Sequence, residues 1–255
     1  MDENLKILFF ANNRVGFEIL KYLKNEDECI IGLVLHPNSN AKYKKEMIAL
    51  FPDLTIIKGN RLKDSLLIKT IKNLKPDIFI SVYFGYILSL ELIGIPIKGA
   101  INLHPAYLPY NKGANPNVWT IIDGTPAGVT IHYMDEGIDT GLIIARREVD
   151  YDYSDTGKTL YEKLEFHSIE LFKENWNNIK NNEISHLYPE EEGTMHYMKD
   201  FSSLNEIYLD KTYKASDLLN ILRARTFPPY KGTYFILDGK KYYIEIKIIK
   251  EDNIL

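Results

Sequence analysis

Residues 6–35, KILFFANNRVGFEILKYLKNEDECIIGLVL, decide the class of fold. Two short apolar runs, at 6–10 and 30–35, have the length and continuity of strands that are buried on both faces. The segment between them places apolar residues at the spacing of one helix face: Val15, Ile19, Leu20 and Leu23. A buried strand, an amphipathic helix and a second buried strand predict a parallel sheet that helices cover.

The same alternation continues along the chain. We expect further helices at 41–50, 63–74, 115–123, 156–179 and 215–226. We expect further strands at 55–57, 77–82, 100–103, 129–134 and 142–149. Near the C-terminus, strands at 233–237 and 241–249 flank Asp238-Gly239, which is a strong signal for a two-residue hairpin turn. The sequence therefore predicts an α/β fold, with helices on both faces of a mostly parallel sheet and a small C-terminal helix and β-hairpin extension.

The distribution of polar residues suggests where the chain divides. Residues 181–200 are polar and irregular, so we expect a linker there. The catalytic domain is then expected at 1–180, and a small C-terminal subdomain at 201–255.

Bulk properties narrow the classes of function. In the 255-residue chain, 45% of residues are hydrophobic and no apolar run reaches the roughly 18 residues of a membrane span, so we expect no membrane partner. The net charge of −4 argues against nucleic acid as the main partner, since phosphate binding usually leaves a basic footprint. Cys29 is the only cysteine, and Met1–Asn4 lack the basic start of a signal peptide, so we expect a cytoplasmic protein.

Asn102 and His104 are the first candidates for chemistry. They lie two residues apart at the end of a predicted strand, so their side chains share one face. In open parallel sheets, ligands bind at the carboxyl ends of the strands. An amide can stabilise an oxyanion, and an imidazole can move a proton near pH 7. The spacing alone is equally compatible with a loop asparagine and a structural histidine.

Asp139 is the third candidate. It lies between Gly137 and Gly141, and glycines allow a backbone to pass close to a ligand. A carboxylate beside His104 would orient its ring and favour the charged form. Taken alone, Asp139 is better explained as an ordinary turn aspartate.

The remaining polar motifs are weaker. The histidines have no metal-ligand spacing, so we expect no metal site, and we expect His132 and His167 to be structural. Five residues carry either a positive charge, which can contact a phosphate, or an aromatic ring, which can stack on a base: Arg14, Arg223, Phe227, Tyr230 and Lys231. A solvated helix end before a Pro-Pro turn is an equally simple explanation of the C-terminal cluster.

Three separated motifs give the chain a family resemblance. Asn102-Leu103-His104-Pro105, Lys112-Gly113-Ala114 and residues 137–141, GIDTG, resemble the 10-formyltetrahydrofolate-dependent formyltransferases in order and spacing. The resemblance implies a Rossmann-like catalytic domain. It also implies Asn102, His104 and Asp139 as the catalytic constellation. N10-formyltetrahydrofolate would be the formyl donor, bound largely through the backbone of these residues: Tyr83, Phe84, Gly85, Tyr86, Ile87, Leu88, Asp135, Glu136, Gly137 and Ile138.

Two further stretches of sequence indicate the branch of the family. LPYNKGANPNVW at 108–119 and RARTFPPYKGTYF at 223–235 resemble the nucleotide-sugar N-formyltransferases. This branch implies a dTDP- or UDP-linked amino-dideoxy sugar as acceptor, such as dTDP-4-amino-4,6-dideoxyglucose or its 3-amino isomer, and a role in bacterial surface polysaccharide (O-antigen) biosynthesis. Arg14, Asn115 and the C-terminal cluster would bind it, and a homodimer is expected.

Three alternatives remain open at this point. A methionyl-tRNA formyltransferase would need to bind tRNA. Residues 186–255 hold ten Lys or Arg and eleven Asp or Glu, a net charge of −1, which argues against tRNA binding. A formyltetrahydrofolate hydrolase would release formate without an amine. A non-enzymatic protein would bind the nucleotide sugar and turn nothing over.

Overall fold

The structure is a computed structural model that describes residues 5–251, except residues 38, 40, 186 and 190. The expected absence of a signal peptide concerns Met1–Asn4, which lie outside the described residues. Two residues of the expected linker at 181–200 lie outside them too. Within the described part of the chain, no helix has the length and apolar character to span a bilayer.

The chain forms two compact units, each built from several segments. The first unit contains residues 1–104, 130–146 and 165–190. The second unit contains residues 105–129, 147–164 and 191–255. The expected division into 1–180, 181–200 and 201–255 stays a prediction.

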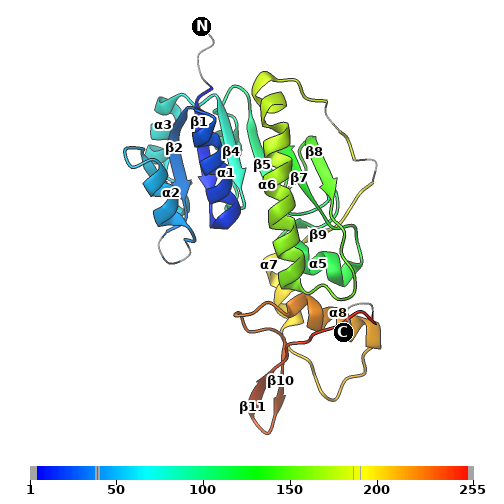
Figure 1. The fold of residues 1–255 in the computed structure, drawn as a ribbon. Coiled ribbons are helices and arrows are strands. Elements are labelled where there is room, and N and C mark those ends of the chain that lie inside the picture. The colour runs from blue at the N-terminus through cyan, green and yellow to red at the C-terminus, as the bar shows by residue number, and fades with distance from the viewer. Residues whose placement is uncertain (1–4, 38, 40, 186, 190, 252–255) are drawn as a thin grey trace. The chain divides into compact units, whose positions relative to one another are not determined.

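The first unit is organised around a seven-stranded sheet with the order β3-β2-β1-β4-β5-β7-β8 (Figure 1). Its strands are β1 (Ile7–Ala11), β2 (Ile30–Leu35), β3 (Ile56–Lys58), β4 (Ile78–Val82), β5 (Ala100–His104), β7 (Gly128–Tyr133) and β8 (Ile143–Glu148). Its helices are α1 (Asn13–Asn25), α2 (Lys44–Leu50), η1 (Gly59–Arg61), α3 (Ser65–Leu74), α4 (Leu90–Ile93) and the later part of α6 (Gly157–Asn181). The first five strands of this order are parallel.

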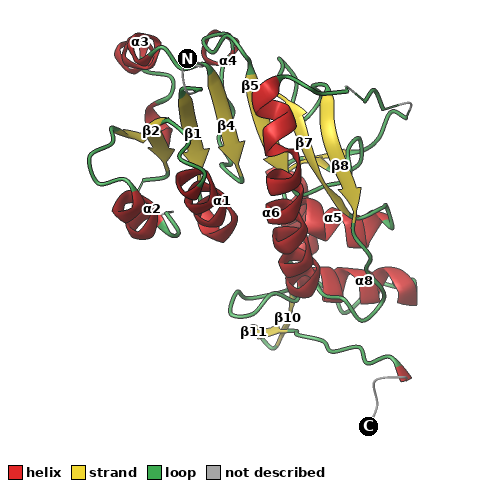
Figure 2. Ribbon diagram, turned by 45° about the horizontal axis from the view of Figure 1, so that its top comes forward, coloured by secondary structure: helices red, strands yellow, loops and turns green. Residues whose placement is uncertain are grey.

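Apolar residues on both faces of the sheet explain why helices cover it. All five residues of β1 are buried, as are all five of β4. Leu8 and Phe10 pack in one cluster with Ile68 and Ile71 of α3. On α1 the predicted stripe is buried, and Figure 2 shows α1 and α2 side by side next to β1 and β2. The predicted α/β class, with a mostly parallel sheet and helices around it, is confirmed.

β7 breaks the parallel pattern. It pairs antiparallel with β5, and the register places Asn102 opposite His132 and His104 opposite Thr130. A mixed sheet with an antiparallel strand near one edge is common in α/β proteins. This register brings residues from two strands to one end of the sheet.

The second unit is smaller and more irregular. Its elements are β6 (Lys112–Gly113), α5 (Pro116–Asp123), the first part of α6, β9 (Met195–His196), α7 (Met198–Phe201), η2 (Ser202–Leu204), α8 (Ala215–Arg225), β10 (Tyr234–Leu237) and β11 (Lys240–Tyr243). β6 pairs with β9, and β10 forms an antiparallel hairpin with β11 around Asp238-Gly239. Both turn residues have positive φ, 50° and 72°, as the predicted two-residue turn requires.

Some elements differ from the expectations. The second hairpin strand ends at Tyr243 rather than at residue 249. The segment expected as a linker contains β9 and the start of α7. β9 has two residues, and it forms because β6 offers a partner 83 residues earlier, which no local sequence pattern reveals.

Candidate active site

The candidate site begins at the carboxyl end of β5. Asn102 and His104 alternate with the buried Leu103 and therefore project from the same face of the strand. Ser81 of β4 lies opposite Asn102 on one side, and His132 of β7 lies opposite it on the other. His104 is 6% exposed, so this imidazole lies mostly out of solvent.

The loop after β7 brings the carboxylate. Asp139 has a φ of 55°, in the left-handed region that residues with a side chain rarely occupy. The carboxylate of Asp135 holds the loop from within, because its Oδ1 accepts hydrogen bonds from the backbone N–H of Gly137 (3.0 Å) and from the hydroxyl of Thr140 (2.6 Å). Gly141 leaves no room for a side chain, since a Cβ there would collide with the carbonyl oxygen of Tyr133.

Four polar side chains meet at this point. The Oδ2 atom of Asp139 lies 3.6 Å from His104 Nε2. Its Oδ1 atom lies 3.4 Å from Asn102 Nδ2 and 3.4 Å from His132 Nε2. Asn102 Nδ2 lies 3.2 Å from His132 Nε2. The structure thus brings together the three residues that the sequence selected, and it adds His132.

His132 is the member that the sequence did not predict, because we expected it to be structural. It is 2% exposed, and its Nδ1 lies 2.8 Å from the carbonyl oxygen of Tyr133. Thr130 and His132 alternate along β7 in step with His104 and Asn102 on β5. Only the antiparallel register makes these residues neighbours, and the sequence gives no sign of that register.

The segment 83–88 follows β4 and combines core anchors with exposed backbone. Phe84 and Leu88 are 2% and 6% exposed and pack in the core cluster, whereas Ile87 is 75% exposed. Gly85 has a φ of 75°, and Tyr83 has a φ of 51° with its hydroxyl 3.0 Å from Ser168 Oγ. The side chain of His36 contacts the carbonyl oxygen of Phe84. The segment is therefore held at both ends and turns sharply between them.

Arg14 lies at the start of α1, directly after the carboxyl end of β1. Its Nε donates to Glu165 Oε2 at 3.1 Å. The Arg14 side chain is 44% exposed and that of Glu165 is 10% exposed. The guanidinium is thus oriented by a partly buried carboxylate at the edge where parallel sheets bind ligands.

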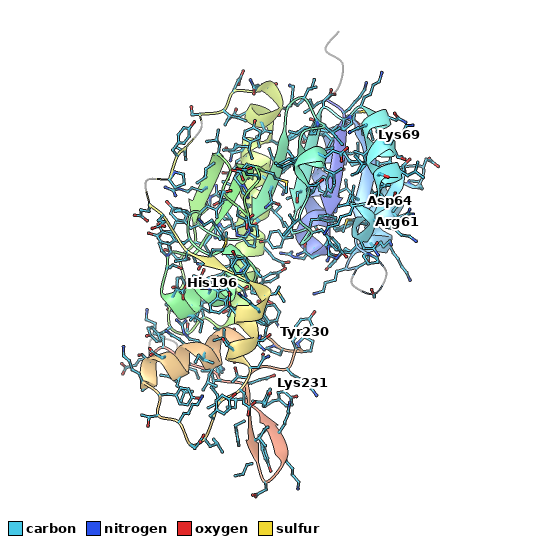
Figure 3. The ribbon with its side chains drawn as sticks, turned by 180° about the vertical axis from the view of Figure 1, so that it is seen from behind. Arg61, Asp64, Lys69, His196, Tyr230 and Lys231 are labelled. Atoms are coloured by element: carbon cyan, nitrogen blue, oxygen red, sulfur yellow. The ribbon has the colours of Figure 1, made fainter. Side chains whose placement is uncertain are left out.

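The other predicted substrate residues lie in the second unit. Asn115 precedes α5 with a φ of 54°, and its Nδ2 lies 3.5 Å from the sulfur of Met198. Phe227 packs edge-on against Tyr161 and lies close to Tyr230, whose backbone N–H donates to the Phe227 carbonyl at 2.9 Å. Tyr230 and Lys231 are exposed and extend from the turn that follows α8 (Figure 3).

Arg223 differs from this exposed pair. It is 4% exposed, and its Nη1 donates to the carbonyl oxygens of Asp152 (3.0 Å) and Asp155 (3.1 Å). Burial lowers the pKa of its guanidinium. These contacts favour a structural role in which Arg223 holds the loop before α6. Its contact with a substrate phosphate stays a prediction.

Two imidazoles and a carboxylate meet at the site, which raises the question of a metal. Among the described residues, no group of three or more His, Cys, Asp or Glu side chains is arranged to hold a metal ion. What the arrangement offers is an amide donor, two imidazoles and a carboxylate. These groups can donate to a developing negative charge and accept a proton.

Comparison with known families agrees with this geometry. Residues 21–175 match the formyl transferase family, and residues 200–250 match the N-formyltransferase dimerization C-terminal domain. The chain belongs to the formyl transferase family. Asn102, His104 and Asp139 all lie within the part that matches the first of these.

Solved formyl transferases share the fold over nearly the whole chain. A 4-N formyltransferase from Francisella tularensis is 29% identical, with a TM-score of 0.84, and the match covers 96% of this chain and 98% of that one. The formyltransferase PseJ from Anoxybacillus kamchatkensis is 30% identical with a TM-score of 0.58, and the match covers 86% and 97% of the two chains. That structure holds UDP-4,6-dideoxy-4-formamido-L-AltNAc and tetrahydrofolate.

Curated formyl transferase relatives fall into several groups. The dTDP-4-amino-4,6-dideoxyglucose formyltransferase of Mycobacterium bovis is 34% identical over 152 residues, which are 59% of this chain and 65% of that protein. The bifunctional polymyxin resistance protein ArnA of Wigglesworthia glossinidia brevipalpis is 30% identical over 252 residues, 94% of this chain and 37% of that protein. Methionyl-tRNA formyltransferases also occur among the relatives. The chain spans 37%, 58% and 57% of the length of the first three curated relatives that it matches.

Proposed function

We propose that this protein transfers a formyl group from N10-formyltetrahydrofolate to the amino group of a nucleotide-linked amino-dideoxy sugar. The observation that carries the proposal is the meeting of Asn102, His104 and Asp139 at the carboxyl end of β5, within a chain of the formyl transferase family. The sugar acceptor is supported by the solved and curated relatives that carry sugar-formyltransferase names.

The proposed chemistry assigns one task to each side chain. Bound N10-formyltetrahydrofolate supplies the formyl group, whose carbon exchanges its bond to N10 for a bond to the sugar amine. Asn102 donates a hydrogen bond to the formyl oxygen as negative charge develops there. His104 accepts the proton that the amine loses, and this proton ends on N10 of the released tetrahydrofolate. Asp139, 3.6 Å from His104 Nε2, stabilises the imidazolium that forms.

The segments predicted to bind folate fit an elongated ligand held by backbone groups. Segment 83–88 presents Gly85 at positive φ between two residues anchored in the core. The second segment, 135–138, is held by the bonds that Asp135 makes inside its own loop. Glycine exposes its backbone N–H and C=O to a ligand without a side chain in the way. We therefore assign the folate to these two segments of the first unit.

The nucleotide sugar is assigned to the remaining predicted residues. Arg14 supplies an oriented positive charge for a phosphate. Tyr230 and Lys231 are exposed, and Phe227 supports Tyr230, so this group can stack on a base and neutralise charge. Asn115 is assigned to the hexose. Arg223 has the least support as a substrate contact, because its Nη1 already donates to two backbone carbonyl oxygens.

We further propose that the chain works as a homodimer in the cytoplasm. The dimer is supported by the match of residues 200–250 to a dimerization domain. The compartment is supported by the single cysteine, which permits no internal disulfide.

The proposal is tested with the purified protein, N10-formyltetrahydrofolate and a panel of dTDP- and UDP-linked amino sugars. We expect release of tetrahydrofolate only when an amino sugar is present, with one formamide formed per folate. The His104→Ala and Asp139→Ala variants are expected to lose about 10²–10⁴-fold in kcat while KM for the sugar changes little. His167→Gln, a histidine on α6, is the matched control and is expected to keep the wild-type rate.

The rival functions give other results in the same assay. Formate release without an amine would identify a hydrolase. Transfer to methionyl-tRNA, with a steep loss of rate as salt rises, would identify the tRNA branch. A shift of the melting temperature by a nucleotide sugar with no turnover would identify a binding protein. Wild-type rates in His104→Ala or Asp139→Ala would overturn the catalytic assignment.

A further inference from the structure

We propose that His132 is a positioning residue that fixes the orientation of the Asn102 amide before substrate binds. The inference rests on the proposed function, since it concerns the same site. It goes beyond that function because it assigns a task to a buried histidine that the proposed chemistry does not use. His132 acts through Asn102 and is not assigned a contact with substrate.

The hydrogen bond at Nδ1 sets the tautomer of His132. Nδ1 lies 2.8 Å from the carbonyl oxygen of Tyr133, and a carbonyl oxygen can only accept, so Nδ1 carries the hydrogen. In the neutral ring, Nε2 then has a lone pair and no hydrogen. The neutral ring is thus an acceptor on the side that faces Asn102.

The lone pair on Nε2 decides which end of the Asn102 amide faces it. Asn102 Nδ2 lies 3.2 Å from His132 Nε2 and 3.4 Å from Asp139 Oδ1. Both of these atoms are acceptors, so the amide nitrogen is the end that can face them. If the amide turned by 180°, its oxygen would face two other acceptors and lose both contacts.

A fixed amide matters because Asn102 has two chemically opposite ends. The N–H end stabilises negative charge on a formyl oxygen, and the C=O end repels it. Catalytic donors are most effective when they are oriented before the reaction, because no energy is then spent on turning them as charge develops. His132 Nε2 and Asp139 Oδ1 lie only 3.4 Å apart, so one N–H of the Asn102 amide can point toward both acceptors while its other N–H stays available for the formyl oxygen.

The cross-strand register makes this arrangement part of the fold. His132 and Asn102 are opposite one another in the antiparallel β5–β7 pair, so their Cβ atoms are close neighbours. His132 is 2% exposed, which removes competing water from the Nε2 contact. A histidine that only filled space would not need Nε2 to face a polar partner.

Two substitutions separate the proposed role from simple packing. In His132→Gln, the side-chain oxygen can take the place of Nε2 and accept from Asn102. His132→Phe keeps a ring and removes the acceptor. We expect His132→Phe to lower kcat by about 100-fold, the size of loss that follows from misplacing a catalytic group, with KM nearly unchanged. The kcat of His132→Gln is expected to lie much closer to the wild-type value than the kcat of His132→Phe. Ile131→Val, a buried change in the same strand, is the control and should keep the wild-type kcat.

A double-mutant cycle tests whether His132 acts through Asn102. In an Asn102→Ala background, His132→Phe should lower kcat by no more than about twofold, because the amide that it positions is already gone. A loss in that background equal to the loss in the wild-type background would overturn the proposal. Equal kcat values for His132→Phe and the wild type would overturn it as well.

A measurement without turnover keeps this inference separate from the proposed function. In protein with ¹⁵N-labelled histidine, the His132 signals are identified as those missing from His132→Gln. We expect a protonated Nδ1 and an unprotonated Nε2 in the neutral ring. A protonated Nε2 in that ring would overturn the inference even if formyl transfer is observed. The expected tautomer in a protein that transfers no formyl group would overturn the proposed function and leave the orientation of Asn102 supported.

Discussion

At the scale of single residues, the loop at 135–141 shows how the backbone places a catalytic candidate. Asp139 has a φ of 55°, which costs free energy for a residue with a Cβ atom. The carboxylate of Asp135 offsets this cost by bonding Gly137 N and the Thr140 hydroxyl. Gly141 lets the chain pass against the Tyr133 carbonyl. The loop is held by contacts that its own residues make, so the Asp139 carboxylate has a defined position.

This close packing leads to a prediction for Gly141→Ala. The added Cβ would collide with backbone, which cannot move aside as a flexible side chain can. The loop must therefore shift, and a shift of about 1 Å at a catalytic group can cost about 100-fold in kcat. We expect this loss of kcat with an unchanged far-UV circular dichroism spectrum. Gly94→Ala is the control, since Gly94 has an ordinary φ of −83° and lies at the end of α4. A Gly141→Ala variant with wild-type kcat would show that the loop is not under this constraint.

The site residues differ in how far the sequence could reveal them. Asn102 and His104 share a face because of the period of a strand, which is a local property. Asp139 lies more than thirty residues later, and only the family resemblance connected it with them. His132 joins the site through the antiparallel register of β7 with β5, which depends on tertiary structure. Arg223 looked like an exposed cation, but its burial depends on the carbonyls of a loop about seventy residues earlier.

At the scale of elements, the sequence predicted most helices and strands because their patterns are local. β2 occupies the predicted residues 30–35, and the predicted apolar stripe from Val15 to Leu23 is buried on α1. The start of α3 shows how such an end is set: Asp64 precedes the helix, and its Oδ1 accepts from Leu66 N at 3.0 Å. Arg61 forms an ion pair with the same carboxylate.

This cap gives a prediction for α3. Replacing Asp64 with Ala removes the hydrogen bond to Leu66 N and the ion pair with Arg61, so we expect the melting temperature to fall by about 2–4 °C at pH 7. Asp64→Asn keeps an acceptor for Leu66 N, so its melting temperature should fall less. Lys69, exposed on the same helix, is the control (Figure 3). Lys69→Ala should leave the melting temperature unchanged, and an equal fall for both alanine variants would contradict the role of the cap.

The difference between wild type and Asp64→Ala should depend on pH. The Arg61 side chain, followed by the Leu66 N–H, lowers the pKa of the Asp64 carboxyl below its ordinary value near 4. A lowered pKa in the folded state means that the charged carboxylate stabilises the fold above the unfolded-state pKa. This stabilisation is lost as pH falls through the folded-state pKa. Thermal melts between pH 7 and pH 3 should therefore show the difference shrinking at the acid end. A constant difference would contradict the ionic contribution.

At the scale of the molecule, the strand order explains why chemistry gathers at one edge of the first unit. The chain continues from β1 to β2 on one side and returns to β4 on the other, so the order reverses between β1 and β4. Ligands bind in such a crevice beyond the carboxyl ends of the strands. Arg14 follows β1, the segment 83–88 follows β4, and His104 ends β5. The sequence predicted these loops, but the order of the strands emerges only from packing of the whole sheet.

The hairpin of the second unit carries the last prediction, which concerns assembly. Isolated two-stranded hairpins are marginally stable in water, yet β10 and β11 expose apolar side chains, with Ile236 43% and Leu237 48% exposed. In the proposed homodimer, a second copy of the chain would cover this surface. We expect the wild type to elute at twice the 29.6 kDa mass of the chain in size-exclusion chromatography with light scattering. Ile236→Glu combined with Leu237→Glu should lower the measured mass to that of a single chain, because burying the new charges would cost more free energy than the interface contact provides. Lys240→Glu alters charge on the same hairpin without removing apolar surface, so it should stay dimeric. A wild type that elutes as a monomer would refute the dimer, and a double variant that stays dimeric would place the interface elsewhere.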